Sequence, residues 1–339
     1  MVVPPRKLKV FISAALVIAA MAFLTIMTAL TPPQQPVLLY PENAPAAIHI
    51  TQNGDITTPA SYNQTPPIER NGDKYTFTGD TSALLVVDKS NIVIDGCGFG
   101  VATTFQLGRG SPGYGLKLLS ISNVTVENVN SPLGIELQRA KNCTIANSAR
   151  VIVYQSNDNV VSNCTGWTLN YAQNNTIIHC TSNEFDVEYS NSNYILHNTC
   201  TGPGRSILIW DSSNNVLFGN VFSNAWWWID IGGSCSNNYF VANNITISQN
   251  YGGDTLVGTN YFYHNNFLRF SWNQSATDNS VNVWSQDERG NYYASYASVD
   301  VNHDGIIDVP FIIDKNNVDN YPLMTPVNIE AEPIPTPHP

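Results

Sequence analysis

Polar and apolar positions along the middle of this chain follow a repeat of the form Asn-x-apolar-x-x-Asn. The clearest copies are Asn215-Val-Leu-Phe-Gly-Asn220, Asn238-Tyr-Phe-Val-Ala-Asn243 and Asn260-Tyr-Phe-Tyr-His-Asn265. Earlier copies begin at Asn91, Asn123, Asn142, Asn159, Asn175 and Asn193. From Asn142 onward, successive copies begin about 16 to 23 residues apart. A repeat of this length is typical of stacked supersecondary units, so it predicts a solenoid.

Each repeat also carries a second short apolar segment before a polar turn. These segments are Ile135-Glu-Leu, Val151-Ile-Val-Tyr, Val187-Glu-Tyr, Ile207-Leu-Ile-Trp and Trp228-Ile-Asp-Ile. Strands this short with no helix between them do not form a doubly wound fold, and the repeats lack the Asn-Gly hairpins of an antiparallel sandwich. We therefore predict an all-β, right-handed parallel β-helix, with ladders of Asn side chains bonded to one another in the turns.

The N-terminal segment has a different character from the repeats. Arg6, Lys7 and Lys9 precede an uncharged run at positions 10–30. A helix of that length would span ~30 Å, the thickness of a bilayer core. The basic flank predicts a cytoplasmic N-terminus and an extracellular C-terminal domain, which gives a single-pass cell-membrane protein. The alternative is a cleaved signal peptide, for which Met27-Thr-Ala29 is the nearest cleavage pattern.

Changes in composition divide the chain into five predicted segments. They are a signal anchor or transmembrane segment (1–31), a Pro-rich spacer (32–47), the β-helix with its N-terminal cap (48–282), a C-terminal capping block with an Asp-rich loop (283–326) and a Pro-rich tail (327–339). Atypical ends are expected, because the edge strands of a solenoid need protection.

Composition excludes one class of partner. Charged residues make up 12% of the chain and the net charge is -11, so no basic stripe is available for nucleic acid.

Six cysteines do not form a small disulfide scaffold, although Cys164 and Cys180 share one offset in successive repeats. Cys164 and Cys180 are interpreted either as two reduced, stacked side chains or as a disulfide. Glycosylation sequons begin at Asn63, Asn123, Asn142, Asn163, Asn174, Asn244 and Asn273 and suggest an exported glycoprotein.

A calcium loop is predicted near the C-terminus. Asp300, Asn302 and Asp304 place oxygen atoms at positions 1, 3 and 5 of such a loop, with Gly305 at the turn and the carbonyl of Ile306 next. Position 12 is Phe311, so the bidentate Glu of an EF-hand is missing. Asp308 or Asp314 would then supply the remaining oxygens, and the predicted role of Ca²⁺ is structural. The alternative is an Asp- and Asn-rich turn that only caps the solenoid.

Aromatic residues suggest a glycan-binding stripe, because sugar rings stack on aromatic faces. The candidates lie just before the turn in successive repeats, namely Tyr154, Tyr171, Tyr189, Trp210 and Trp227. Ordinary core packing is the alternative, since alternate residues of a strand point inward.

A catalytic reading would need two carboxylates about 5–9.5 Å apart on one face. Candidates for such a pair are Glu136, Asp186, Glu188, Asp211 and Asp230, and the most plausible are Glu188, Asp211 and Asp230. A shift of one residue sends a side chain to the opposite face of a strand, so the sequence does not establish convergence. His179, His197 and His264 are expected to replace ladder residues.

The repeat, together with Leu85-Val-Val-Asp-Lys-Ser-Asn-Ile-Val-Ile-Asp-Gly96, resembles the NosD family, which overlaps the carbohydrate-binding and sugar-hydrolase β-helix superfamily. The C-terminal block resembles the tail of archaeal surface proteins of that group, through Gly290-Asn-Tyr-Tyr293, Asp304-Gly-Ile-Ile-Asp-Val-Pro310 and Asp319-Asn-Tyr-Pro-Leu-Met324. Tyr293 stands where the family usually has Trp, and Ile307 where it often has Gly. The resemblance implies copper handling for some members only. Clustered metal ligands are not evident here, so no copper is predicted.

These observations predict a membrane-anchored cell-surface β-helix. Its expected work is non-catalytic, either binding of a surface or extracellular polysaccharide or a structural role in the envelope. A polysaccharide lyase or glycoside hydrolase is the alternative. A NosD-like accessory protein for metalloenzyme maturation is the second alternative.

Overall fold

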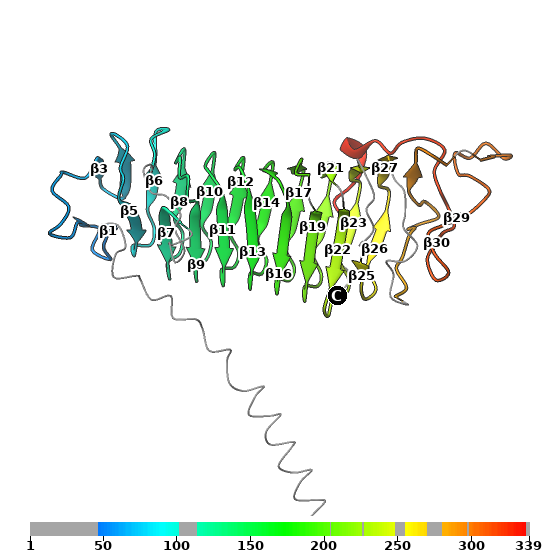
Figure 1. The fold of residues 1–339 in the computed structure, drawn as a ribbon, viewed down its shortest axis with the longest axis horizontal. Coiled ribbons are helices and arrows are strands. Elements are labelled where there is room, and N and C mark those ends of the chain that lie inside the picture. Colours follow the sequence, from blue (N-terminus) through cyan, green and yellow to red (C-terminus); the bar gives the residue numbers. More distant parts are fainter. Residues whose placement is uncertain are drawn as a thin grey trace, which may run out of the picture. The chain divides into compact units, whose positions relative to one another are not determined.

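The computed structural model describes residues 47–101, 114–203, 205–225, 227–247, 255–269, 280–296 and 298–336. All of them belong to one compact unit, Ala44–Pro339. Their regular structure is almost entirely short strands stacked along one axis (Figure 1). The all-β prediction is therefore confirmed for this part of the chain.

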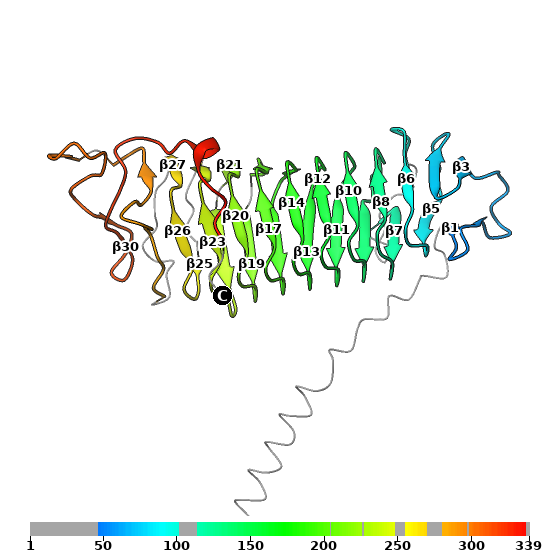
Figure 2. The ribbon, with the colours of Figure 1, turned by 180° about the vertical axis from the view of Figure 1, so that it is seen from behind.

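Two long sheets face each other along the stack (Figures 1 and 2). Sheet A contains, in spatial order, β2 (Ile56–Thr57), β1 (Ala47–Ile50), β5 (Leu84–Val87), β7 (Leu116–Leu119), β9 (Ile135–Gln138), β11 (Val151–Tyr154), β13 (Trp167–Asn170), β16 (Phe185–Glu188), β19 (Arg205–Trp210), β22 (Trp227–Gly232) and β25 (Thr255–Leu256). Sheet B contains β26 (Tyr261–Tyr263), β23 (Tyr239–Val241), β20 (Val216–Phe218), β17 (Tyr194–Leu196), β14 (Thr176–Ile178), β12 (Val160–Ser162), β10 (Thr144–Ala146), β8 (Thr125–Glu127), β6 (Val93–Asp95), β4 (Lys74–Phe77) and β3 (Ile68–Asn71).

A third sheet accompanies only the later coils. Sheet C contains β15 (Thr181–Ser182), β18 (Thr199–Cys200), β21 (Val221–Ala225), β24 (Asn244–Ile247), β27 (Asn266–Arg269) and β28 (Tyr292–Tyr293). A separate antiparallel pair, β29 (Phe311–Ile312) with β30 (Val318–Asp319), and the 3-10 turn η1 (Ile329–Ala331) lie in the C-terminal block.

Strand pairing identifies the fold as a parallel β-helix. Each coil pairs in parallel register with the next one, as Val151 with Trp167 in sheet A and Val160 with Thr176 in sheet B. Antiparallel strand pairs within the described residues lie near the ends, between β1 and β2, β3 and β4, and β29 and β30. The first two hairpins cover the N-terminal edges of sheets A and B, which would otherwise offer free backbone groups.

The core lies between the sheets and is built from stacked like residues. Strands such as β11 and β16 alternate buried and half-buried residues, because successive side chains point to opposite faces. Phe240, Phe262 and Trp284 form one such stack, with ring centroids 4.6 and 4.7 Å apart. Each coil therefore buries its apolar face against its neighbours rather than against a separate layer.

Two buried ladders of Asn side chains flank sheet B and explain the repeat. The first Asn of each motif, such as Asn215, and the last, such as Asn220, are both fully buried. The Oδ1 atom of Asn220 accepts from the backbone and side-chain nitrogens of Asn198 at 2.9 and 3.1 Å, and its Nδ2 donates to the carbonyl of Ile195 at 2.8 Å. Each Asn thus satisfies backbone groups that a turn would leave unpaired.

The earliest copies of the motif are out of register with these ladders by one residue. Asn91, Asn123 and Asn142 adopt positive φ values of 60, 57 and 53° in the turn itself. Cys143 stands at the ladder position of its coil, where its N–H donates to Oδ1 of Asn159 at 2.9 Å. Asn tolerates the left-handed conformation better than most residues. A turn Asn and a ladder Asn therefore look alike in sequence.

Both ladders end in the C-terminal block. The first reaches Asn317, whose Nδ2 donates to the Asp314 carboxylate at 2.9 and 3.0 Å. The second ends at Asp319, whose Oδ2 accepts from the backbone N–H of Asn291 at 2.7 Å and from the hydroxyl of Tyr293 at 3.2 Å. Asp319 is an acceptor without a donor, so it stops a ladder that Asn would continue.

Coil length changes part-way along the stack. Successive ladder residues are 16 apart from Asn159 to Asn175, 18 apart to Asn193, 22 apart to Asn215 and 23 apart to Asn238. The added residues lie on one side and build sheet C, which begins at β15. The solenoid therefore widens between β13 and β19.

Other sequence predictions have mixed outcomes. The described chain contains no helix long and apolar enough to cross a membrane, so the prediction of a single-pass cell-membrane protein is not supported and is withdrawn. The run at positions 10–30, on which it rested, lies outside the described residues. Cys164 and Cys180 stand at adjacent positions of the second ladder as free thiols, with the N–H of Cys164 3.3 Å from Sγ of Cys180.

The ladder predicts a large cost for one substitution. Asn220→Leu removes the partners of Asn198 and of the Ile195 carbonyl, all buried. An unsatisfied buried group costs ~1–3 kcal/mol, so the free energy of unfolding should fall by about 3 kcal/mol or more. Urea unfolding measures this change. Asn183→Leu, the same substitution at an exposed site, should change stability by less than about 0.5 kcal/mol. Equal effects would show that the ladder does not stabilise the fold.

The ladder terminus predicts a pH dependence. Burial raises the pKa of Asp319 from 3.8 to about 6. A carboxyl group that binds its proton more tightly when folded makes the free energy of unfolding fall as pH rises from about 4 to about 6. At ~1.4 kcal/mol per pKa unit, the fall is about 3 kcal/mol at most. The pKa of Asp186 is also raised to about 6, so Asp319→Asn should reduce the fall measured by urea unfolding across this range without abolishing it. Parallel profiles for the two proteins would exclude Asp319 as the titrating group.

Candidate functional site

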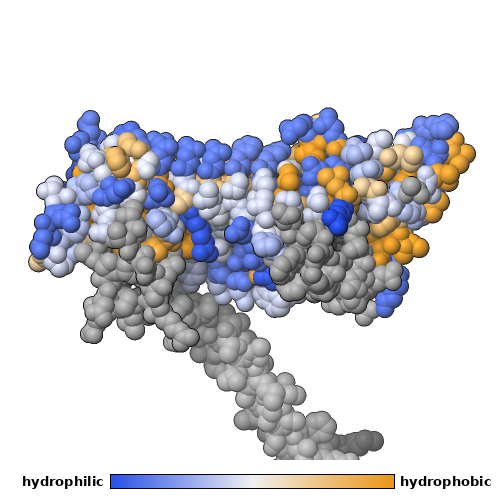
Figure 3. All heavy atoms as spheres, turned by 45° about the horizontal axis from the view of Figure 1, so that its top comes forward, coloured by the Kyte–Doolittle hydropathy of each residue, from blue (hydrophilic) through white to orange (hydrophobic). Residues whose placement is uncertain are grey.

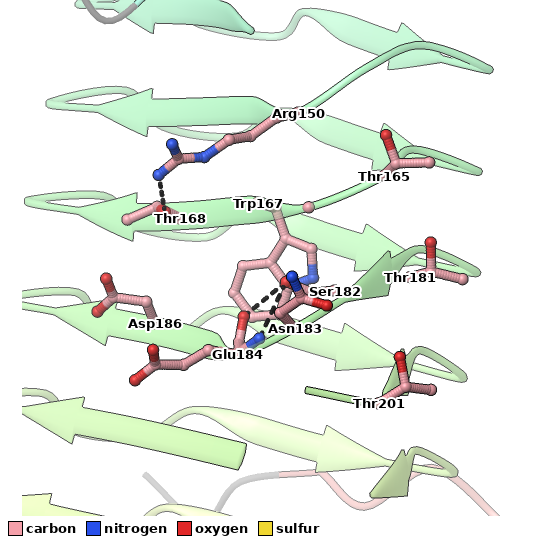
Figure 4. A pocket seen from close by; sticks show the side chains of 11 residues that line it. Arg150, Thr165, Trp167, Thr168, Thr181, Ser182, Asn183, Glu184, Asp186 and Thr201 are labelled. Carbon is pink, nitrogen blue, oxygen red and sulfur yellow. Dashed lines mark hydrogen bonds between the residues drawn. The ribbon is translucent and has the colours of Figure 1, made fainter. Parts of the chain in front are cut away.

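A hollow of about 450 Å³ opens where the solenoid widens. It lies beside the first residues of β13 and β16 and the turns that lead into them (Figure 4). Its lining is mostly hydroxyl, amide and charged groups, contributed by Arg150, Thr165, Gly166, Trp167, Thr168, Thr181, Ser182, Asn183, Glu184, Asp186 and Thr201. A short turn precedes β13, whereas the next coil carries the extra residues of β15, so neighbouring coils leave a step between them.

Asp186 is the most perturbed acid of the hollow. It lies on the outer face of β16, between the inward-facing Phe185 and Val187. Burial, followed by the nearby charges of Glu188 and Glu184, raises its pKa from 3.8 to about 6. Its Oδ1 atom is buried and has no hydrogen-bond partner among the described residues. Buried polar groups are normally paired, so this oxygen is available to a ligand donor.

Arg205 links two further carboxylates of the same face. Its Nε lies 2.7 Å from Oε1 of Glu184, and its Nη1 lies 2.9 Å from Oδ2 of Asp230. Asp186 pairs with Leu208 of the next strand, and Leu208 pairs with Asp230 of the strand after it. Asp186 and Asp230 are thus two coils apart, which places their Cα atoms ~9.6 Å apart at ~4.8 Å per coil. Two acids are therefore held by Arg205, while Asp186 is not.

The remaining acidic candidates are not bound by Arg205. Glu188 shares the outer face of β16 and accepts from Nδ2 of Asn170 at 2.9 Å. Asp211 lies in the turn after β19 with a φ of 46°, and its Oδ1 accepts from the N–H of Ser234 at 2.7 Å. Glu136 forms a buried ion pair with Lys117 at 3.1 Å. Of the predicted catalytic residues, Glu188 and Asp230 thus lie on one face and Asp211 has a turn role.

Sequence reasoning missed the basic residues and one acid. Arg150, Glu184 and Arg205 were not predicted site residues, although Glu184, Asp186 and Glu188 are spaced by two along β16 and the residue before it. That spacing is the sequence signal for one common face. The pairing of Arg205 with Asp230, from the next strand of sheet A, has no counterpart in local sequence.

The aromatic candidates form two adjacent columns rather than one stripe. Tyr154 and Trp210 end β11 and β19, whereas Tyr171 and Tyr189 lie one residue beyond their strands, with φ values of 52 and 50°. The rings of Tyr171 and Tyr189 stack at 4.7 Å and 7°, so these two rings cover each other's faces. The two Tyr side chains are nonetheless 42 and 39% exposed.

Trp210 is placed differently and is 41% exposed. Its six-membered ring occupies the space above Gly232, where any side chain would collide with it. Glycine at position 232 therefore lets the indole lie across the boundary between two coils. The side chain of Trp227, the fifth predicted glycan-binding residue, lies outside the described residues.

The hollow itself is lined mainly by polar groups. Figure 3 shows hydrophilic and neutral residues over the middle coils, with larger apolar patches toward the C-terminal end. The hollow lies at the start of β13 and β16, and the aromatic columns lie at their end. A four-residue strand is ~13 Å long, so one extended ligand could contact both.

The predicted calcium loop is closed by its own hydrogen bonds. The carboxylate of Asp300 accepts from the N–H groups of Asp304 and Gly305 at 3.3 and 3.0 Å. Oδ1 of Asp304 accepts from the N–H of Ile306 at 2.8 Å, and Oδ2 of Asp308 accepts from the N–H of Val301 at 2.7 Å. Asn302 donates to Asp304 at 2.8 Å. Asp300, Asp304 and Asp308 therefore each accept from at least one backbone N–H group of the loop.

Comparison with known proteins gives a family and an architecture. A family model described as "Periplasmic copper-binding protein (NosD)" matches residues 90–298. No curated protein sequence matches significantly. Similar solved structures include PfbA, a surface adhesin of Streptococcus pneumoniae (11% identity, covering 64% of this chain and 69% of that one, TM-score 0.39). The tailspike protein of E. coli bacteriophage HK620, solved with a hexasaccharide, is 12% identical, with 65 and 48% covered and a TM-score of 0.37.

A further similar structure is the periplasmic alginate epimerase AlgG, with 10% identity, 64% of this chain and 78% of that one covered, and a TM-score of 0.28. Identities and TM-scores this low assign no activity to this chain. The family description mentions copper, but the described residues contain no group of three or more His, Cys, Asp or Glu side chains arranged to hold a metal. His179 and His197 only stack, at 5.6 Å between ring centroids. The described residues therefore do not fit a copper site.

Calcium binding at the loop remains a prediction that melting can test. If Asp300, Asn302, Asp304 and Asp308 hold Ca²⁺ in the folded state alone, stability rises by ~2.7 kcal/mol at a hundredfold excess over Kd. The melting temperature should then be higher in Ca²⁺ than in chelator for the wild type and equal for Asp304→Ala. Identical melting of the wild type in both conditions would mean that hydrogen bonds alone hold the loop.

Proposed function

We propose that this chain, which belongs to the NosD family of parallel β-helix proteins, binds a polysaccharide across the outer face of sheet A without cleaving it. Family membership follows from the match over residues 90–298 and agrees with the resemblance in the sequence. The observation that carries the proposal is the placement of the polar hollow and the exposed aromatic residues at the two ends of β13 and β16, within reach of one extended ligand.

Chemistry on this face suits sugar hydroxyl groups. Thr165, Thr181 and Thr201 offer hydroxyls, and Asp186 offers an unpaired carboxylate oxygen. At the far end of the strands, Trp210 offers an apolar surface, whereas Tyr171 and Tyr189 present ring edges and hydroxyls because one face of each ring is covered. The mixture of a few polar groups with aromatic surface is typical of small-ligand sites.

Two features favour binding over cleavage. Hydrolysis needs an acid and a base or nucleophile about 5–9.5 Å apart. Glu184 and Asp230 are both bound by Arg205, and Glu188 accepts from Asn170, so each of these neighbouring acids in the described chain already has a partner. Arg205 thereby holds Glu184 and Asp230 in place on the face that a ligand would contact.

A polysaccharide lyase or hydrolase is the second candidate, and Asp186 is the observation that favours it. A carboxyl group with a pKa of about 6 can exchange a proton near neutral pH. Arg150, at the rim of the same hollow, would stabilise negative charge on a substrate.

Polysaccharide binding should depend on the exposed indole. On a glycan array or by calorimetry with the full chain, Trp210→Ala should weaken the tightest interaction about tenfold, which is ~1.4 kcal/mol. Tyr321→Ala, at a half-buried aromatic in the C-terminal block, is the matched control and should leave affinity unchanged. Unaltered binding by the Trp210 variant would remove this face from the site.

The same sugars decide between binding and cleavage. Wild type incubated with each bound polysaccharide should release neither new reducing ends nor unsaturated sugars. If product appears and Asp186→Asn abolishes it while affinity persists, the chain is an enzyme and the non-catalytic proposal is wrong.

A further inference from the structure

The outer face of sheet B changes character along the stack. In β8 and β10 the outward residues are polar or small and half-exposed, such as Thr125, Glu127 and Thr144. In β20 and β23, Leu217 and Phe240 point into the core. Their neighbours on the same strands point outward, yet they are apolar and buried. Together they form a second apolar cluster outside the helix, consisting of Leu196, Val216, Phe218, Tyr239, Val241, Ala242 and Tyr263.

The C-terminal tail lies on this second cluster. Ile329 packs against it, and Figure 2 shows the tail crossing the strands of sheet B beside β23. Val327 donates its N–H to Oδ1 of Asn266 at 2.7 Å and accepts from Nδ2 of Asn266 at 3.0 Å. The tail is therefore held at its start by a paired amide contact.

A charged contact holds the tail further along. Oε2 of Glu332 lies 2.8 Å from Nδ1 of His264, and its Oε1 lies 3.6 Å from Nη2 of Arg289. Glu332 is only 11% exposed, so this contact is shielded from solvent. Polar contacts thus fix the tail on both sides of Ile329.

The end of the tail has the sequence of a polyproline segment. Proline occupies positions 333, 335, 337 and 339. Glu332 has φ -80° and ψ 140°, which are polyproline II angles. Glu332 and Pro335 are half-buried whereas Pro333, Ile334 and Thr336 are exposed, a spacing of three that matches one turn of that helix.

We propose that the outer face of sheet B from β17 to β26 is a binding surface for a proline-rich segment, occupied by the chain's own tail. Polyproline II segments bind grooves lined with aromatic rings because they lose little conformational entropy. This face supplies such rings, including Tyr239 and Tyr261 stacked at 4.5 Å and 3°. Attachment to the same chain gives the tail an effective concentration near millimolar, so it excludes moderate competitors.

A labelled peptide with the sequence of residues 327–339 tests the proposal by fluorescence anisotropy. The chain shortened to end at Asn328 should bind it at least tenfold more tightly than the full chain, whose surface is occupied. A peptide with its four prolines replaced by glycine is the control and should bind at least tenfold more weakly. Circular dichroism identifies folded samples. If the shortened chain does not fold, the full-length double variant Ile329→Asp, Glu332→Lys takes its place.

Two results would overturn the assignment. In the first, the shortened chain or the double variant is folded but does not bind the peptide, or binds the glycine-substituted peptide equally well. Either outcome would show that this face does not recognise proline-rich segments. Size-exclusion chromatography of the full chain should give a monomer. A dimer that disappears on shortening would mean that the tail of a second copy, rather than the chain's own, occupies the surface.

Discussion

The buried Asn ladders constrain everything else in this molecule. A turn packed between two coils leaves backbone groups that water cannot reach, and an unpaired group there costs ~1–3 kcal/mol. Asn is suited to this position because its side chain both accepts and donates. Asn193 accepts from Asn175 and donates to Asn215 and to the Ala172 carbonyl. From β17 to β26, both ends of each sheet B strand are fixed this way, so the length of coil outside the ladders is free to change.

That freedom produces the candidate site. Growth from 16 to 22 residues between ladder positions leaves the stacked core in register and adds residues only on the side of sheet C. The polar hollow lies at this transition. Its acids gather because parallel register repeats one strand face from coil to coil, and Arg205 spans the strands to offset part of their mutual repulsion. The site is thus a consequence of a change in coil length within a regular stack.

The outer faces of the two long sheets have opposite chemistry. Sheet A presents charges, hydroxyls and half-exposed aromatics, as expected for a wet surface that binds polar ligands. The late coils of sheet B present a continuous apolar cluster, which would associate with other molecules if left open. The tail contacts that cluster with a segment whose prolines leave few backbone donors for pairing. Glu332 and Val327 fix it by the few polar contacts that the apolar face permits.

The sequence by itself determined the repeat, and with it the parallel β-helix, because period and strand length are local properties. It also placed Asn215 and Asn220 in structural roles. It could not separate Asn142 in a turn from Asn159 in a ladder, since both environments favour Asn. Tertiary structure alone decided which acids meet. Asp186, Glu188 and Asp230 share a face and Asp211 does not, while Arg205 joins Asp230 to Glu184. The fold of the tail onto sheet B was equally invisible, because His264 and Glu332 are 68 residues apart and nothing local encodes their contact.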